Sequence, residues 1–308
     1  MLKGAQLYGW RNSSRIFALI VWSLRHGVIN SIMRFRNRRL FQVKANKQFV
    51  AGNTSISDSD DFQDFLNICG SASQDLKLFS KFRRSYGLAE VVDNVSLEQG
   101  KGYIQEIHRQ DEWNEDYTNA LRKIDSVGSP RKYFFAKIGF CSPTSLRYLK
   151  VLVDLKTLFG PIKSFNIVEI GVGFGGQAGL IVSLENPSSY RLLDVEPVLA
   201  LSRTFVEKLD LESEFSWHDG RNPEKMKPDL VISNYAFSEL SRDLQKQYLD
   251  NIILPSKRGY ITWNASTVGQ EKCYSIDELI RIIPNSRIKA EVPNTAASNV
   301  IIFWGPNL

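Results

Sequence analysis

The chain has 308 residues, of which 43% are hydrophobic and 23% are charged, an ordinary globular composition that excludes wholesale disorder and a collagen-like chain. The length allows one large domain or two modest ones. Its three cysteines, Cys69, Cys141 and Cys273, form no Cys-x-x-Cys pair. This spacing argues against a disulfide scaffold or a zinc site and favours a reducing, cytoplasmic compartment. No apolar stretch reaches the roughly 18–20 residues that cross a bilayer.

The formal net charge of +6 is concentrated at one end of the chain. Residues 1–50 contain ten Lys or Arg and no acid, and the first acid is Asp58. The other 29 bases face 33 acids, so the rest of the chain is mildly acidic. A nucleic-acid-binding protein spreads its basic residues over a folded face, and we therefore expect no nucleic-acid partner.

The first predicted element is an amphipathic helix in this basic arm, residues 1–50. Residues 16–24 (IFALIVWSL) are mostly apolar and are followed by Arg25, where a signal peptide would have a small-residue cleavage site. A basic amphipathic helix is suited to an anionic membrane surface, which would place the protein peripherally on the inner face of the membrane. Two alternatives stay open: a helix packed on the body or on a second subunit, and an organellar targeting peptide. The oligomeric state is not predicted.

The next elements are weakly patterned. Residues 51–75 are rich in Ser and Asp and read as a linker that enters a helix near Phe62. Residues 75–124 are patchily helical and end before a turn at Gly128-Ser129-Pro130. We expect residues 51–127 to form a linker and a helical cap, and residues 128–308 to form the main domain.

Strands and helices then alternate. Ser142-Pro143 predicts the start of a helix that ends at Gly160-Pro161, and Ser275 begins a capping box before a later helix. The last two strands follow one another with no helix between them. The predicted strands are 165–170, 190–193, 215–217, 229–233, 259–263, 287–292 and 299–304, and the helices between them include 197–209 and 241–254. This order predicts an α/β fold, a Rossmann-like, mostly parallel sheet with an antiparallel C-terminal hairpin and an N-terminal helical region.

A glycine-rich turn follows the first strand of this series. Gly171, Gly173 and Gly176 fit the pattern G-x-G-x-x-G, in which the backbone can approach a ligand closely. Asp194 ends the next strand, where a carboxylate can accept both hydroxyl hydrogen bonds of a ribose. The two features predict a cofactor that contains adenosine. The alternative is a tight turn beside an acid that only caps a helix.

The nature of the cofactor depends on Glu169. This carboxylate, two residues before Gly171, would repel a pyrophosphate but attract the ammonium and sulfonium groups of S-adenosylmethionine (SAM). The closing hairpin also differs from the two βαβαβ halves of a dinucleotide fold. We therefore predict SAM. The alternatives are an NAD(P)-dependent oxidoreductase and a catalytically inactive, membrane-associated scaffold.

Four stretches of the chain resemble the bacterial sugar O-methyltransferases, a branch of the class I SAM-dependent methyltransferases. They are residues 129–160, 167–177 (IVEIGVGFGGQ), 229–240 (DLVISNYAFSEL) and 257–264 (KRGYITWN). Val172 departs from the family pattern EIGGGYGGQ. The resemblance covers roughly the last 180 residues. It implies a class I methyltransferase sheet in residues 128–308 and methylation of a sugar hydroxyl in polysaccharide biosynthesis, on a glycan or a nucleotide- or lipid-linked sugar.

The resemblance also implies roles for the residues at the strand ends. The methionine moiety would be surrounded by Glu169, Gly171, Gly173 and Gly175. Asp194 would hold the ribose, and Trp217 would border the adenine unless it belongs to the core. Asn234 would pass under the sulfonium.

A sugar hydroxyl is weakly acidic, so its methylation needs a base. Glu239 is the first candidate, although it could serve only as an acid at a helix N-terminus. His218 is the second. Tyr235 and Arg147 are predicted substrate contacts, because an aromatic ring stacks on a sugar and a guanidinium binds hydroxyls or a phosphate; Arg147 could instead pair with a surface acid. No metal is expected, and the cap, residues 51–127, would close over the acceptor site.

Overall fold

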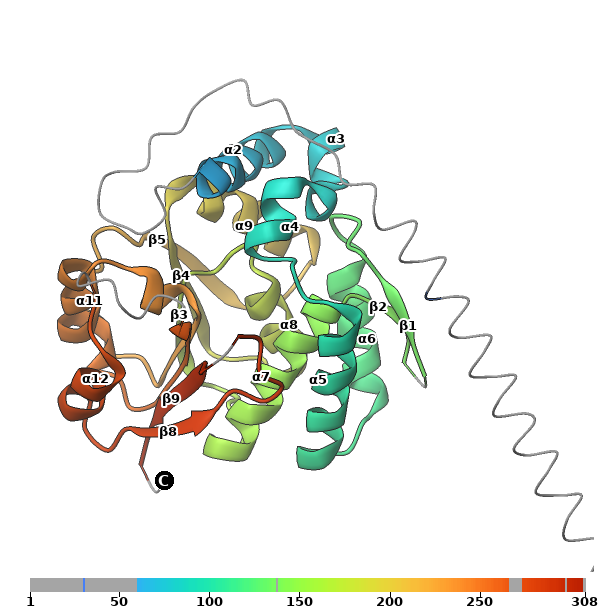
Figure 1. The fold of residues 1–308 in the computed structure, drawn as a ribbon. Helices are drawn as coiled ribbons and strands as arrows, with labels where there is room; N and C mark the ends of the chain where they lie inside the picture. Colours follow the sequence, from blue (N-terminus) through green and yellow to red (C-terminus); the bar gives the residue numbers. More distant parts are fainter. Residues whose placement is uncertain (1–29, 31–59, 137, 266–272, 297, 307–308) are drawn as a thin grey trace, which may run out of the picture.

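The computed structural model describes residues 30, 60–136, 138–265, 273–296 and 298–306. Its centre is a seven-stranded sheet with the order β5-β4-β3-β6-β7-β9-β8 (Figure 1). The strands are β3 (Asn166–Ile170), β4 (Ser189–Asp194), β5 (Glu214–Asp219), β6 (Leu230–Asn234), β7 (Gly259–Trp263), β8 (Arg287–Ala290) and β9 (Val300–Trp304). The five strands from β5 to β7 are parallel, whereas β9 runs antiparallel to both β7 and β8. The predicted fold class is therefore confirmed.

Helices cover both faces of the sheet because the strand side chains alternate between two apolar cores. Ile167 and Leu192 face one core, and Val168 and Leu193 face the other. The first core is completed by α7 (Pro143–Phe159), α8 (Gly176–Glu185) and α9 (Glu196–Lys208). The second is completed by α10 (Ala236–Glu239), α11 (Arg242–Tyr248), η2 (Leu249–Ile253) and α12 (Ile276–Ile282).

The N-terminal helices pack directly on α7 to α9, the helices that complete the first core (Figure 1). They are α2 (Asp60–Gln74), α3 (Leu76–Phe79), η1 (Phe82–Arg84), α4 (Tyr86–Val91), α5 (Leu97–Gln110) and α6 (Glu115–Asp125). α2 contacts α9, and α5 contacts α7, so their apolar side chains belong to the same core as those of α7 to α9. α2 begins at Asp60, two residues before the start near Phe62 that the sequence predicts. A short hairpin that the sequence did not predict follows α6, with strands β1 (Tyr133–Phe135) and β2 (Gly139–Cys141).

A fully buried arginine joins these helices to the start of α7. Arg83 donates from Nε to Asp93 at 2.9 Å and from Nη1 to Asp125 at 3.2 Å. Its Nη2 lies 3.3 Å from the hydroxyl of Ser142, the N-cap of α7. Two carboxylates and a hydroxyl therefore surround one guanidinium inside the protein.

The predicted amphipathic helix of the basic arm lies outside the described residues. Asn30 alone is described from residues 1–50, and its side-chain amide exchanges two hydrogen bonds with the backbone of Phe134 in β1 (3.1 and 2.9 Å). Among the helices that the structure describes, none combines the length and apolar character needed to cross a membrane.

Candidate active site

The loop from β3 to α8 passes against the end of β6. Gly171, Gly173 and Gly175 have φ values of 76°, 52° and 85°, which residues with a side chain rarely adopt. A Cβ at Gly171 would lie 2.0 Å from the Cβ of Ala236, which follows the exit of β6. At position 171, only glycine allows this close approach. Gly175 is the N-cap of α8 and offers no side chain to the first turn, whose N–H groups suit a ligand carboxylate.

Asp194 holds this loop from the end of β4. Its Oδ2 accepts a hydrogen bond from the backbone N–H of Val172 at 2.8 Å, and its Oδ1 accepts one from Val195 at 2.8 Å. Burial raises the pKa of Asp194 to about 6, while the backbone hydrogen bonds oppose the rise. A carboxylate has about four acceptor positions, so a ribose could still be bound. That contact stays a prediction.

The side chain of Glu169 is buried beneath the glycine loop and is not exposed beside it. Its side chain is 2% exposed, and its Oε2 accepts a hydrogen bond from the hydroxyl of Tyr190 at 2.8 Å. Burial raises the pKa of Glu169 to about 8, against which the Tyr190 hydrogen bond acts. At pH 7 the ligand-free protein therefore holds this residue mostly as the neutral acid. Its predicted contact with the methionine moiety requires that a bound cation favour the ionised form.

The proton on the Glu169 carboxyl makes the free energy of unfolding depend on pH. The folded state keeps the Glu169 proton up to a pH of about 8, whereas the unfolded chain has an ordinary glutamate pKa, so folding takes up a proton between those values. The free energy of unfolding should therefore fall as the pH rises from about 6.5 to 8, by at most about 1.4 kcal/mol per pH unit. Urea unfolding measures this slope. Glu169→Gln, which still accepts from Tyr190, should flatten it, and equal slopes in the two proteins would refute the assignment.

The two predicted residues of β5 point to opposite faces of the sheet. Trp217 donates from Nε1 to Ser202 of α9 at 3.2 Å, and the guanidinium of Arg203 lies 5.1 Å from its ring centroid. His218 faces the other side, where its Nε2 lies 3.0 Å from the hydroxyl of Ser216. Burial and Arg191 lower the pKa of His218. β4 and β3 separate β5 from β6, so the structure does not bring His218 together with Glu239.

The exit of β6 carries three of the predicted residues. Asn234 accepts a hydrogen bond from Thr262 at 3.3 Å and lies 3.5 Å from Gln177 in the first turn of α8. Tyr235 follows with a φ of 71°, unusual for a residue with a side chain. Glu239, in α10, accepts from Asn264 at 3.3 Å, and burial raises its pKa.

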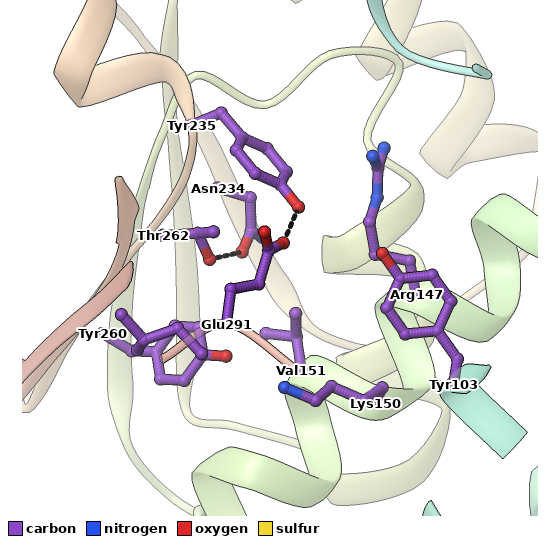
Figure 2. Close-up of a pocket in the computed structure, with 10 residues that line it drawn as sticks. Tyr103, Arg147, Lys150, Val151, Asn234, Tyr235, Tyr260, Thr262 and Glu291 are labelled. Carbon is purple, nitrogen blue, oxygen red and sulfur yellow. Dashed lines mark hydrogen bonds between the residues drawn. The ribbon is translucent and has the colours of Figure 1, made fainter. Parts of the chain in front are cut away.

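A pocket opens beside this exit, on the α7 side of the sheet. Figure 2 shows Tyr235, Asn234 and Thr262 on one wall, Tyr103 and Arg147 on the opposite wall, and the Glu291 carboxylate between them. The full lining is Tyr103, Arg147, Lys150, Val151, Asn234, Tyr235, Tyr260, Thr262, Glu291 and Ile301. Two predicted substrate contacts, Tyr235 and Arg147, are therefore brought together, with the guanidinium 5.5 Å from the Tyr235 ring. Glu239 does not line this pocket.

Sequence reasoning missed most of the pocket. Tyr103 comes from α5, in a region that the sequence showed only as patchily helical, and Glu291 directly follows β8. Lys150 is buried in α7 and donates to Asp154 at 2.7 Å, which also accepts from Tyr260 at 2.7 Å. No motif singles out any of these residues. The one usable signal was a lysine and an aspartate at i and i+4 on the apolar face of a predicted helix.

No group of three or more His, Cys, Asp and Glu residues could hold a metal ion within the described part of the chain.

The chain was compared with known proteins. No protein-family model and no curated protein matches it. Among solved structures, it is similar to the methyltransferase domain of bacterial CtHen1-CN, with 10% identity, 52% of this chain and 97% of that chain covered, and a TM-score of 0.41. A SAM-dependent methyltransferase from Aquifex aeolicus is similar at 18% identity, over 51% of this chain and 87% of that chain, with a TM-score of 0.38. A mutant of MtNAS in complex with S-adenosylmethionine is similar at 14% identity, over 82% and 94%, with a TM-score of 0.39.

Proposed function

We propose that the chain is a class I SAM-dependent methyltransferase that transfers a methyl group to a hydroxyl of a sugar. The observation that carries the proposal is the glycine loop, with Gly171 against Ala236 and Asp194 bonded to Val172. Ligands of open α/β sheets bind at the carboxyl ends of the strands, where the strand order reverses. Here the order reverses at β3, between β4 and β6, and the loop lies at that point.

The residues at this point fit the proposed cofactor. The uncapped first turn of α8 suits the methionine carboxylate, and Asp194 suits the ribose hydroxyls. The antiparallel β9 lies between β7 and β8. A dinucleotide-binding fold has six parallel strands instead, so this arrangement favours SAM over NAD(P). The cofactor would supply a methyl group on a positively charged sulfur. Trp217 is half-buried, packs against the first core and donates to Ser202, which supports a packing role better than a border of the adenine.

The pocket beside β6 supports a hydroxylated acceptor. Tyrosine rings pack on the apolar faces of a sugar, and their hydroxyls bond to its polar edge. Tyr103 of α5 lines this pocket, and a Cβ at Gly173 would lie 3.2 Å from Val92 at the end of α4. These contacts support a role for residues 51–127 as a cap over the acceptor. The acceptor proton must pass to a base near β6; Glu239 lies there and is one candidate, whereas the position of His218 on β5 argues against it.

Calorimetric titration of the full chain with SAM, S-adenosylhomocysteine and NADH tests the cofactor. We expect micromolar binding of the two sulfur compounds and none of NADH. Asp194→Asn should weaken SAM binding by about 10- to 100-fold, because a charge-assisted hydrogen bond contributes roughly 1.5–3 kcal/mol. The matched control is Asp229→Asn, which alters an acid that bonds to Asn166 at the opposite end of the sheet. Binding of NADH, or equal SAM affinity in all three proteins, would refute the proposal.

We also propose that residues 1–50 attach the protein to an anionic membrane surface. Their ten bases without an acid support this, since each base near anionic lipid contributes about 1 kcal/mol. The full chain should co-sediment with vesicles that contain phosphatidylserine and should dissociate at high salt. A full chain that stays in the supernatant with these vesicles would refute the proposal and favour a helix packed on the body or on a second subunit.

A further inference from the structure

Tyr235 and Glu291 form a hydrogen-bonded pair inside the pocket. The Tyr235 hydroxyl donates to Oε1 of Glu291. Glu291 is only 5% exposed. Oε2 of Glu291 accepts from the backbone and the hydroxyl of Thr295 (3.0 and 2.6 Å) and from Asn299 at 3.1 Å. The carboxylate is thus held on one side by its own loop, and its other oxygen faces a single tyrosine.

The backbone aims this tyrosine at the position where an acceptor would react. A φ of 71° strains the backbone of a residue with a side chain, and such conformations cluster at functional sites. The N–H of Tyr235 donates to the carbonyl of Thr262 in β7 at 2.9 Å, which keeps the strained residue in place. Ala236, the next residue, touches Gly171 of the cofactor loop. Tyr235 therefore lines the pocket and directly precedes the residue that contacts the glycine loop.

Charged and titratable groups face Tyr235 from each element packed around it. They are Tyr103 of α5, Arg147 of α7, Tyr260 of β7 and Glu291 after β8. The Arg147 guanidinium, anchored by a 2.9 Å hydrogen bond to the carbonyl of Val92, would stabilise negative charge that develops on the Tyr235 oxygen. Tyr103 lines the pocket and is only 2% exposed. Its hydroxyl has no hydrogen-bond partner among the described residues. A buried hydroxyl without a partner is suited to a ligand hydroxyl.

We infer that Tyr235 and Glu291 together remove the proton of the acceptor hydroxyl, an inference that rests on the proposed methyltransferase function. As the acceptor oxygen bonds to the methyl carbon, the carbon–sulfur bond breaks and its electron pair stays on sulfur. The acceptor proton passes to Oη of Tyr235, while the proton of Tyr235 passes to Oε1 of Glu291. Tyrosine is regenerated, and Glu291 returns its proton to solvent when the products leave. Tyr235 is the catalytic residue, and Glu291 acts through it.

The coupled transfer is needed because Tyr235 alone is a poor base. Burial raises the pKa of Tyr235 to about 12; Arg147 acts against this rise and Glu291 adds to it. A free tyrosinate is therefore scarce at neutral pH. A tyrosine that passes its proton to a carboxylate as it receives another never has to carry the full charge.

Five single variants of the full chain test this route, Tyr235→Phe, Glu291→Gln, Glu291→Asp, Thr295→Val and Glu239→Gln, together with the double variant that combines Tyr235→Phe and Glu291→Gln. With SAM and a sugar acceptor, Tyr235→Phe and Glu291→Gln should each lower kcat by about 100-fold, the usual size of a lost acid–base step, and the double variant should lose no more. KM and the affinity for S-adenosylhomocysteine should change by less than about threefold. Thr295→Val removes one donor to Glu291, the hydroxyl, but keeps the backbone N–H donor and the carboxylate, and should lose less than about threefold in kcat. Glu291→Asp should recover part of the rate.

A second readout does not depend on turnover. The tyrosinate absorbance of each protein, after subtraction of its Tyr235→Phe counterpart, reports the pKa of Tyr235. Glu291→Gln should lower this pKa, because it removes a negative charge beside the phenol. A tyrosine that ionises more easily while the reaction slows is expected only if Glu291 takes the proton.

Other outcomes overturn the inference. A Glu291→Gln protein that reacts as fast as the wild type or faster would show that Tyr235 acts without a proton acceptor. Loss of kcat in Glu239→Gln but not in Glu291→Gln would assign the base to Glu239. If the unaltered chain does not bind S-adenosylhomocysteine, the proposed function itself fails. If it binds but the Glu291 variants are unaffected, only the proton route fails.

Discussion

Replacing Gly171 by alanine is expected to destabilise the protein by about 2–5 kcal/mol and to abolish binding of S-adenosylhomocysteine. The added Cβ would lie 2.0 Å from the Cβ of Ala236, an atom attached directly to the backbone after β6. No flexible side chain can move aside, so the glycine loop or the exit of β6 must shift. Overpacking of this kind costs about 1–3 kcal/mol, and a φ of 76° costs an alanine about 1–2 kcal/mol more. Urea unfolding and calorimetric titration measure the two effects.

Gly160 offers a matched control for the contact. Its φ is 74°, nearly that of Gly171, but a Cβ there would have no atom within 4 Å. Gly160→Ala should therefore show only the backbone cost, about 1–3 kcal/mol for its φ of 74° and ψ of −164°, and should leave cofactor affinity unchanged. Equal losses of stability in the two variants would mean that backbone strain, and not the contact with Ala236, explains the glycine at position 171.

The second large effect is expected at Arg83. Arg83→Met would remove the guanidinium and leave the buried carboxylates of Asp93 and Asp125 without their cation. Removing one partner of a buried ion pair costs about 3–5 kcal/mol, because the remaining charge is not solvated. The loss should also weaken cofactor binding, since Asp93 adjoins Val92, which packs against Gly173 in the cofactor loop. Denaturant unfolding and titration with S-adenosylhomocysteine measure these changes.

Neutralising the two acids provides the control for Arg83. If the cost comes from unpaired charge, the triple variant Arg83→Met, Asp93→Asn, Asp125→Asn should recover at least half of the lost stability. A triple variant no more stable than Arg83→Met would show that lost packing, rather than unpaired charge, explains the effect.

The architecture was predictable because its signals are local. Strand β3, the carboxylate that ends β4, and the capping box of Ser275 and Glu278 all lie where the pattern of apolar residues and turn residues placed them. The hairpin of β1 and β2 was missed, since each of its strands has only three residues and carries no periodic pattern. The start of α2 at Asp60 lies two residues before the start near Phe62 that the sequence predicts.

The site was predictable only in part. The glycine loop and Asp194 lie together because the carboxyl ends of adjacent parallel strands meet, and Tyr235 and Arg147 share one pocket. Glu291 pairs with Tyr235 across 56 residues of sequence, a contact that depends on how β8 and β9 are added to the sheet. His218 and Glu239 are both predicted as bases near strand exits, but His218 lies in β5 and Glu239 follows β6, and β4 and β3 separate these two strands in the sheet.

By itself, the amino-acid sequence determined the alternation of strands and helices, the glycine turn and the acid at the end of the next strand. These features depend on residue periodicity and on the conformational freedom of single residues, which act over a few positions. Only the tertiary structure decided that Glu169 is buried with Tyr190 and that Glu291 meets Tyr235, because burial and pairing between distant residues depend on the packing of the whole chain.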